Sequence, residues 1–250
     1  MASSIPNCRA YDPCFAYELA VILEDGLRTM LDRQEDVFYY LTLMNENYLH
    51  ATMAAGADEG ILRGMYLVRP GAVEGGSEPS EPRRVQLMGS GTILREALAA
   101  AELLERDWGI AADVWSVTSF TELRRSGLEC ERCNRFNPTV QPRRAWAEQC
   151  LESTTGPVIA ATDHVRAVPD LIRTWIPRRY VTLVTDGFGR SDTRAALRCF
   201  FEVDRTSIAL AAIKALADDG EVNRSLVQEF MTRYDYQPPA SAPWADQRSE

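Results

Sequence analysis

Two cysteines, Cys130 and Cys133, stand in the pattern Cys-Glu-Arg-Cys. Such a pair can supply half of a structural zinc site, or can exchange disulfides where it opens a helix beside a sheet. A zinc site needs two further ligands, and the other cysteines lie far away along the chain. The pair lies in a polar stretch rich in Arg and Asn, so we expect free thiols without a metal or redox role.

The chain has two histidines, His50 and His164. A nucleophilic triad needs a histidine base beside a serine or cysteine, and neither histidine lies in such a motif. His164 follows Asp163 after a predicted strand, which is a position that can be functional. A surface histidine is nevertheless the interpretation that we favour.

The segment Gly89-Ser90-Gly91 lies between a predicted strand and a predicted helix, where the helix N-terminus can bind a phosphate. The dinucleotide fingerprint needs a third glycine at the position that Leu94 occupies. We therefore expect a tight turn without a ligand.

The most distinctive stretch is Thr185–Asp192, which reads Thr-Asp-Gly-Phe-Gly-Arg-Ser-Asp. It follows a predicted strand and opens a predicted helix, so it should lie at the carboxyl edge of the sheet, where α/β proteins bind ligands. Arg190 could bind a carboxylate or phosphate, and Ser191 or Asp192 could cap the helix. We favour a structural turn in which Phe188 packs in a cleft and the charges pair locally. The residues of this structural or interface loop are Asp186, Phe188, Arg190 and Ser191.

The candidate residues named above lie in a stretch of the chain where predicted strands and helices alternate. Strands are expected at 65–68, 85–88, 114–117, 157–161 and 180–184, and helices at 92–109, 168–176, 191–201, 206–218 and 222–234. This alternation predicts an α/β fold with a mostly parallel sheet and helices on both faces. Residues 71–84 have the composition of a mobile surface loop, and the chain from residue 238 should fray.

The first organised segment is expected to be a helix over 14–31, with Asp12 as its N-cap, and a strand over 37–43. The strand is apolar almost throughout, as is usual for a strand covered on both faces. One helix and one strand cannot bury these faces alone, and an unpaired strand edge promotes association. We therefore expect the chain to self-associate or to need a partner, and residues from about 57 onward to fold independently.

The composition excludes several classes of protein. A chain of 250 residues with 46% hydrophobic and 25% charged residues is globular rather than disordered. A net charge of −9 makes nucleic acid and anionic membranes poor partners. The sequence has no signal-peptide pattern and no apolar run of about 20 residues, which a membrane-spanning helix requires. Six cysteines are few for a disulfide framework, so we expect reduced thiols in a cytoplasmic protein.

Longer motifs follow one another in order over roughly residues 5 to 235, namely Ile5–Cys8, Tyr11–Pro13, Ala16–Glu18, Tyr39–Tyr40, Asn45–Tyr48, Val117–Leu123 and Thr185–Asp192. Together they resemble the homodimeric bacterial pyruvate dehydrogenase E1 component. The resemblance implies the C-terminal portion of an enzyme of the transketolase type. That enzyme decarboxylates pyruvate with thiamine diphosphate and magnesium, and acetylates the lipoyl group of its E2 partner, dihydrolipoyl acetyltransferase.

The resemblance also implies a division of the chain. Residues 1–55 would end the pyrimidine-binding domain, residues 56–84 would form a connecting segment with an acidic Gly/Pro loop, and residues 237–250 would be a flexible tail. Residues 85–236 would form a three-layer α/β/α domain like the transketolase C-terminal domain. The partners implied are the remainder of E1, on the same or a separate chain, the second E1 of the homodimer, and E2.

No catalytic, cofactor-binding or metal-binding residue follows from the resemblance. The Gly-Asp-Gly…Asn motif for magnesium and diphosphate is absent, and the family's catalytic residues have no counterpart here. The chain alone should therefore bind thiamine diphosphate weakly or not at all. The sequence departs from the family pattern at Cys133, where an aromatic residue is usual, at His164, where Tyr is usual, and at Cys199-Phe200, where His or Arg is expected. The sequence leaves three interpretations of the chain: a fragment of the enzyme, a natural split subunit, or a stand-alone interaction module.

Overall fold

The structure is a computed structural model that describes residues 4–73, 83–239 and 241–245. A sheet of five strands forms its centre, in the order β3-β5-β4-β6-β7. Strands β5, β4, β6 and β7 run parallel to one another, and β3 pairs antiparallel with β5. The mostly parallel sheet is thus confirmed. The strands are β3 (Tyr66–Arg69), β4 (Arg84–Gly89), β5 (Ala111–Ser116), β6 (Val158–Ala161) and β7 (Tyr180–Leu183).

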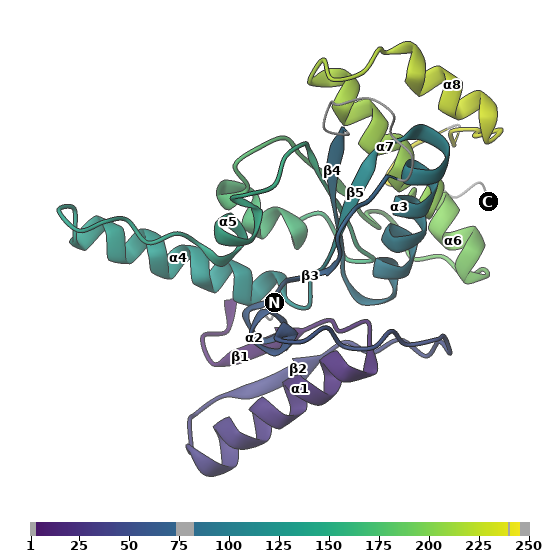
Figure 1. Ribbon diagram of the computed structural model, residues 1–250. Coiled ribbons are helices and arrows are strands. Elements are labelled where there is room, and N and C mark those ends of the chain that lie inside the picture. Colours follow the sequence, from purple (N-terminus) through teal and green to yellow (C-terminus); the bar gives the residue numbers. More distant parts are fainter. Residues whose placement is uncertain (1–3, 74–82, 240, 246–250) are drawn as a thin grey trace.

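Helices cover both faces of this sheet (Figure 1). One face carries α3 (Leu94–Trp108), α7 (Arg205–Asp218) and α8 (Ser225–Arg233). The other carries α4 (Phe120–Phe136), α5 (Trp146–Leu151) and the 3-10 helix η4 (Pro169–Trp175). Alternate strand residues enter opposite cores, because successive side chains of a strand point to opposite faces. In β6, Ile159 packs on the α3 side and Val158 on the α4 side.

The first residues form a smaller unit beside the main sheet (Figure 1). Strand β1 (Cys8–Tyr11) pairs in parallel with β2 (Phe38–Leu41), and α1 (Ala16–Leu27) continues into the π-helix η2 (Arg28–Asp32). The short helix α2 (Ala57–Arg63) packs against α1. The strand expected over 37–43 is therefore paired with β1 along one edge, and its other edge has no paired strand among the described residues.

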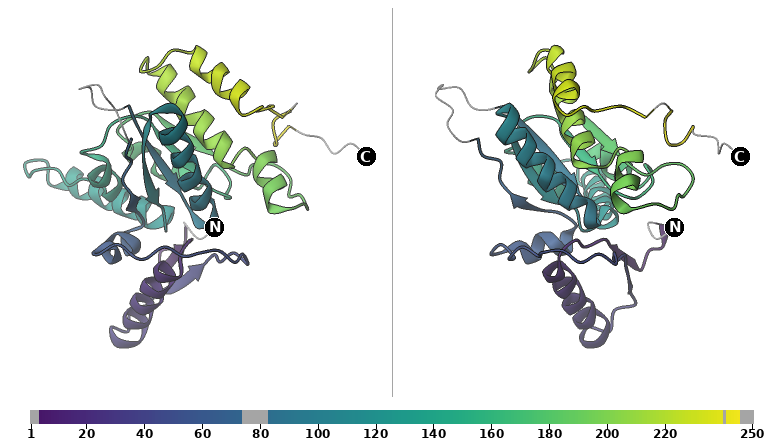
Figure 2. Two further views of the ribbon diagram at one scale, coloured as in Figure 1. Left: turned by 45° about the vertical axis from the view of Figure 1, so that its right-hand side comes forward. Right: turned by 90° about the vertical axis from the view of Figure 1, so that its right-hand side faces the viewer.

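Several contacts join this unit to the main domain. Tyr11 and Ile22 share a core with Ile61 and Tyr66. The guanidinium of Arg125 in α4 donates hydrogen bonds to the carbonyl oxygens of Pro6, at 2.7 Å, and Cys8, at 3.0 Å. The two views of Figure 2 show that α1 and β2 otherwise project from the domain.

Glu18 fixes the start of α1. Its carboxylate accepts hydrogen bonds from the backbone amides of Cys14, at 2.6 Å, and Phe15, at 2.9 Å, so Asp12 is not the N-cap that the sequence predicts. Its other oxygen accepts from the hydroxyls of Tyr66 and Ser116. Glu18 is fully buried, and this burial raises the pKa of its carboxyl group.

Other predicted boundaries differ in detail. Cys130 and Cys133 lie in helix α4, which the polar composition of this stretch did not reveal. Helix α6 (Arg194–Phe200) is capped by Thr193, whose hydroxyl accepts from the amide of Ala196, rather than by Ser191 or Asp192. Most of the loop expected at 71–84 lies outside the described residues. Among the described residues, no helix is both long and apolar enough to span a membrane.

Candidate functional site

The carboxyl ends of β4 and β6 lie side by side at the point where the sheet topology reverses. The chain leaves β4 through α3 on one face, and leaves β6 through η4 on the other. Open α/β sheets bind ligands in the crevice that such a reversal creates. Ser90 and Thr162 follow the two strands, and their hydroxyl oxygens lie 2.7 Å apart. This edge is the candidate functional site.

Asp12, Asp163 and His164 meet at this edge, and we call them the switch-point cluster. Atoms that could serve as metal ligands, one from each residue, all lie within 4.8 Å of one another. Nε2 of His164 is 3.3 Å from Oδ2 of Asp12. His164 still reaches the surface, with 31% of its side chain exposed, but it also contacts a carboxylate, which a plain surface histidine need not do.

The backbone holds Asp12 from two sides. Its amide donates to the carbonyl of Thr118 at 2.7 Å, and its carbonyl accepts from the amide of Gly91 at 3.0 Å. Gly91 has a φ of +49°, and a Cβ at this position would lie 2.9 Å from each Asp12 carboxylate oxygen. The second glycine of Gly89-Ser90-Gly91 thus allows the carboxylate to approach the turn closely.

Two members of the switch-point cluster, Asp163 and His164, have raised pKa values. Contact with the Asp12 carboxylate raises the pKa of His164, although partial burial opposes this change. Burial raises the pKa of Asp163, and the nearby Asp12 charge adds to the effect. Sequence reasoning missed the cluster because Asp12 is distant in the chain. The Asp163-His164 pair directly after a predicted strand was the available signal.

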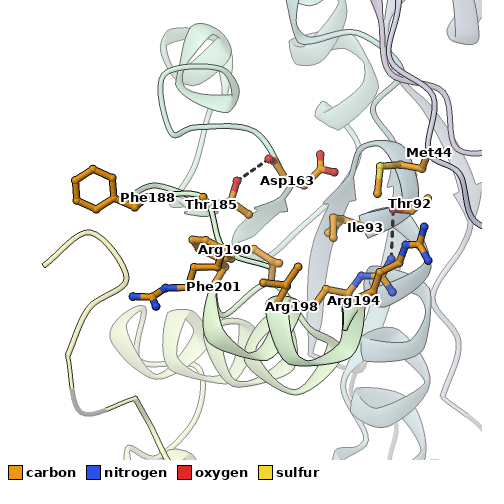
Figure 3. Close-up of a pocket in the computed structure, with 14 residues that line it drawn as sticks. Met44, Thr92, Ile93, Asp163, Thr185, Phe188, Arg190, Arg194, Arg198 and Phe201 are labelled. Carbon is orange, nitrogen blue, oxygen red and sulfur yellow. Dashed lines mark hydrogen bonds between the residues drawn. The ribbon is translucent and has the colours of Figure 1, made fainter. Parts of the chain in front are cut away.

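A pocket of about 310 Å³ adjoins the cluster (Figure 3). Thr185 ties its loop to the cluster: its hydroxyl donates to the carbonyl of Asp163 at 2.6 Å, and its amide to that of His164 at 3.1 Å. The loop therefore lies at the carboxyl edge of the sheet, as expected. The lining residues are Met44, Thr92, Ile93, Asp163, Thr185, Gly187, Phe188, Gly189, Arg190, Arg194, Leu197, Arg198, Phe201 and Val203.

The predicted loop residues do not act as one group. Asp186 accepts a hydrogen bond from the amide of Arg166 at 2.9 Å. Phe188 is 66% exposed, so the expectation that it packs in a cleft is wrong. The Arg190 guanidinium lies 4.4 Å from the ring centre of Phe200, which is a cation–π contact. Ser191 is exposed. Only Phe188 and Arg190 of the four line the pocket among the described residues.

Glu46 links the segment after β2 to the helices beside the pocket. Its carboxylate pairs with Arg95 at 2.6 Å and with Arg198 at 2.8 Å. Arg198 also pairs with Glu96 at 3.2 Å. Burial acts to raise the pKa of Glu46, but the charge of Arg198 and the hydrogen bonds from both arginines outweigh it and lower the pKa.

The Cys130–Cys133 pair lies one helical turn apart on α4, away from the cluster. The potential metal ligands that gather in the described residues are Asp12, Asp163 and His164, without a cysteine. That the two cysteines carry no metal stays a prediction. His50 accepts a hydrogen bond from the amide of Ala16 at 2.9 Å and stacks on Tyr48.

Comparisons with protein families and curated proteins agree on the relationship. Residues 64–204 match the model of the transketolase-like TK C-terminal domain, and residues 1–51 match that of the pyruvate dehydrogenase E1 component middle domain. The chain is 55% identical over 236 residues to the pyruvate dehydrogenase E1 component of Cupriavidus necator, and 52% identical over 244 residues to that of Pseudomonas aeruginosa. These matches cover 94% and 97% of this chain but 26% and 27% of those proteins, so the chain spans about a quarter of their length.

Solved structures show the same fold at low identity. Transketolase from Campylobacter jejuni has a TM-score of 0.58 at 16% identity, over 85% of this chain and 27% of that chain. A split gene transketolase, described as an inactive beta4 tetramer, has a TM-score of 0.53 at 16% identity, over 86% of this chain and 60% of that chain. The chain therefore belongs to the transketolase-like C-terminal domain family, and it matches the C-terminal portion of pyruvate dehydrogenase E1 components.

Proposed function

We propose that this chain completes a pyruvate dehydrogenase E1, which oxidatively decarboxylates pyruvate and transfers the acetyl group to the lipoyl group of E2. The proposal rests on the 55% and 52% identity to E1 components of which the chain covers only about a quarter. In this proposal the chain is a structural and dimer-forming portion that is inactive alone. The loop of Asp186, Phe188, Arg190 and Ser191 would face other parts of E1.

An uncovered apolar surface supports this proposal. Exposed leucines recur every fourth residue along α1 and η2, and alternate aromatic residues of β2 share the uncovered face of the small sheet. The other face of β2 packs inward, since Tyr39 and Leu41 join the core shared with α1. We call the exposed set the N-terminal apolar face: Leu23 (47%), Leu27 (56%), Leu31 (67%), Phe38 (44%) and Tyr40 (56%).

Exposed apolar side chains on the outer side of α1 and on the uncovered face of the small sheet mark an interaction site or an aggregation risk. Residues 1–51 match the E1 middle domain, which supports the proposal that the remainder of that domain covers the N-terminal apolar face. In the intact enzyme this face would then be buried, and α1 would become an interior helix. The chain would contribute to the enzyme by completing that domain and by attaching the C-terminal domain to it.

The residues of this chain do not fit the cofactor of the family. The sequence contains no Gly-Asp-Gly…Asn motif, and the described acidic residues near the sheet edge lie beside a histidine rather than in such a motif. We propose that thiamine diphosphate and magnesium bind the remainder of E1. The cofactor supplies the carbanion chemistry, and no step of it is assigned to a residue of this chain.

Reconstitution tests the proposal. The remaining part of a related E1 is produced as a separate chain and mixed with this one, and pyruvate decarboxylation is followed with an artificial electron acceptor. We expect activity from the mixture and none from either part alone. Activity of the isolated 250-residue chain, or full activity of the other part without it, would refute the proposal.

Two matched substitutions sharpen this test. Leu27→Glu places a charge on the N-terminal apolar face and should weaken reconstitution at least tenfold. Leu128→Glu changes a similarly exposed leucine (42%) on α4 and should leave it unchanged. Equal effects of both substitutions would show that the N-terminal apolar face does not contact the rest of the enzyme.

The remainder of E1 could reside on the same chain or on a separate one. The structural likeness to a chain named as a split gene transketolase supports considering the second arrangement. Sequencing the DNA upstream distinguishes them: a separate thiamine-binding reading frame supports a split subunit, and one continuous frame supports a single long chain.

A further inference from the structure

We propose that Asp12, Asp163 and His164 bind a divalent first-row transition-metal ion at the switch point of the sheet. This inference concerns the switch-point cluster alone and does not depend on the proposed function. It adds a metal site to a chain for which the sequence predicts none.

The spacing of the cluster suits a metal ion. Zinc and similar ions bind imidazole nitrogen and carboxylate oxygen at about 2.0–2.2 Å, which places tetrahedral ligands about 3.4 Å apart. Nε2 of His164 and Oδ2 of Asp12 are already 3.3 Å apart. One carboxylate oxygen of Asp163 lies within 4.8 Å of a ligand atom of each of the other two residues, so a change of its side-chain torsion angles would bring the third ligand to the ion.

A second observation points independently to a ligand. Asp12 is 9% exposed, and its buried Oδ2 atom has the His164 imidazole 3.3 Å away but accepts no hydrogen bond of good geometry among the described residues. A buried carboxylate oxygen without a hydrogen bond costs free energy, and native structures avoid this arrangement. The atom lies beside the His164 imidazole, where a cation would bind both groups.

The surrounding structure would fix the ligands. The carbonyl oxygens of Asp163 and His164 both accept hydrogen bonds from Thr185, and the amide of His164 donates to the Thr162 hydroxyl at 3.3 Å. Such contacts around a site orient the metal ligands and strengthen binding. Gly91 is needed for the approach of Asp12 to the turn.

The ligand set indicates the class of ion and what it could do. One imidazole and two carboxylates suit Zn²⁺, Mn²⁺, Fe²⁺ or Co²⁺ better than thiolate-preferring ions. Three protein ligands leave a position for water or for an anionic ligand. That position would be near the pocket, because Asp163 also lines it (Figure 3).

Manganese is the probe of choice, because it prefers oxygen and nitrogen ligands and the chain has six cysteines that would compete for zinc. Titration of the 250-residue chain with Mn²⁺, followed by the electron paramagnetic resonance of the free ion, should show one saturable site. Asp163→Asn and His164→Gln should each weaken binding at least tenfold. His50→Gln, which removes the other histidine, is the matched control and should leave binding unchanged.

A measurement on the unsubstituted chain makes the test independent of whether the variants fold. With two histidines in the chain, substoichiometric Mn²⁺ should broaden the imidazole proton resonances of His164 before those of His50. The proposal is overturned if binding is only weak and multiple, if it survives both cluster substitutions, or if His50 broadens first.

Discussion

At the scale of single residues, a substitution of Gly91 tests how closely the Asp12 carboxylate packs against the backbone. Gly91→Ala should destabilise the chain through a left-handed backbone, at about 1–2 kcal/mol, and through a clash with the carboxylate in addition. Gly109→Ala is the matched control, because Gly109 has a φ of +61° and no atom within 4 Å of an added Cβ. Urea unfolding of both variants measures the difference. An equal loss of unfolding free energy in the two variants would mean that the Asp12 carboxylate moves aside without cost.

The Glu46 contacts should make stability depend on pH. Because the folded-state pKa of Glu46 is lowered, its contribution is present above the unfolded-state pKa near 4.5 and is lost as the pH falls through the folded-state value. Glu46→Gln should therefore cost about 1 kcal/mol near neutral pH, and this difference should vanish in acid.

Unfolding free energies of the two proteins between pH 7 and pH 3 measure the effect. The matched control is Glu24→Gln, which removes an exposed i,i+4 pair between α1 and Arg28, the first residue of η2. A difference between the original chain and Glu46→Gln that stays constant throughout this range would contradict the interpretation.

At the scale of elements, the alternating pattern was enough to predict the five strands of the main sheet and most of its helices. The missing elements have physical reasons. Helix α4 buries only Phe120, Leu123 and Gly127. Its sequence therefore lacks the regular spacing of apolar residues that would predict a helix. Strand β1 has four residues, and its pairing with β2 depends on a distant segment. The switch-point cluster could not be predicted for the same reason, because its residues come together only when the sheet has formed.

The boundary between the two units leads to a prediction that reverses the sequence-based expectation. Removal of residues 1–55 would take Tyr11 and Ile22 from the core that they share with Ile61 and Tyr66. It would also remove Glu18 from the hydroxyls of Tyr66 and Ser116. Loss of large core side chains costs about 2–5 kcal/mol each, so we expect the truncated chain to unfold at a much lower urea concentration than the full chain.

Circular dichroism during urea titration of both chains is the measurement. A fusion in which an unrelated soluble protein replaces residues 1–55 controls for solubility. An unchanged midpoint for the truncated chain would show that the C-terminal domain is stable without these contacts.

At the scale of the whole molecule, the N-terminal apolar face should drive association of the isolated chain. Light scattering over a range of protein concentrations should show oligomers, because exposed apolar surface is buried when two copies meet. Leu31→Glu should shift the chain toward monomer, since Leu31 is the most exposed residue of this face at 67%. Leu128→Glu on α4 should not. If the unsubstituted chain is monomeric at all concentrations, the N-terminal apolar face does not drive association.

The contacts between Arg125 and the first strand have a consequence for biosynthesis. The guanidinium of Arg125 binds carbonyl oxygens of Pro6 and Cys8, which precede it by 119 and 117 residues. A ribosome adding about 5–20 residues per second needs roughly 6–23 s to cover that distance. For most of this interval β1, α1 and β2 have been synthesised without the helix α4 that anchors them. We therefore expect the nascent segment to expose its apolar side chains until translation has delivered α4.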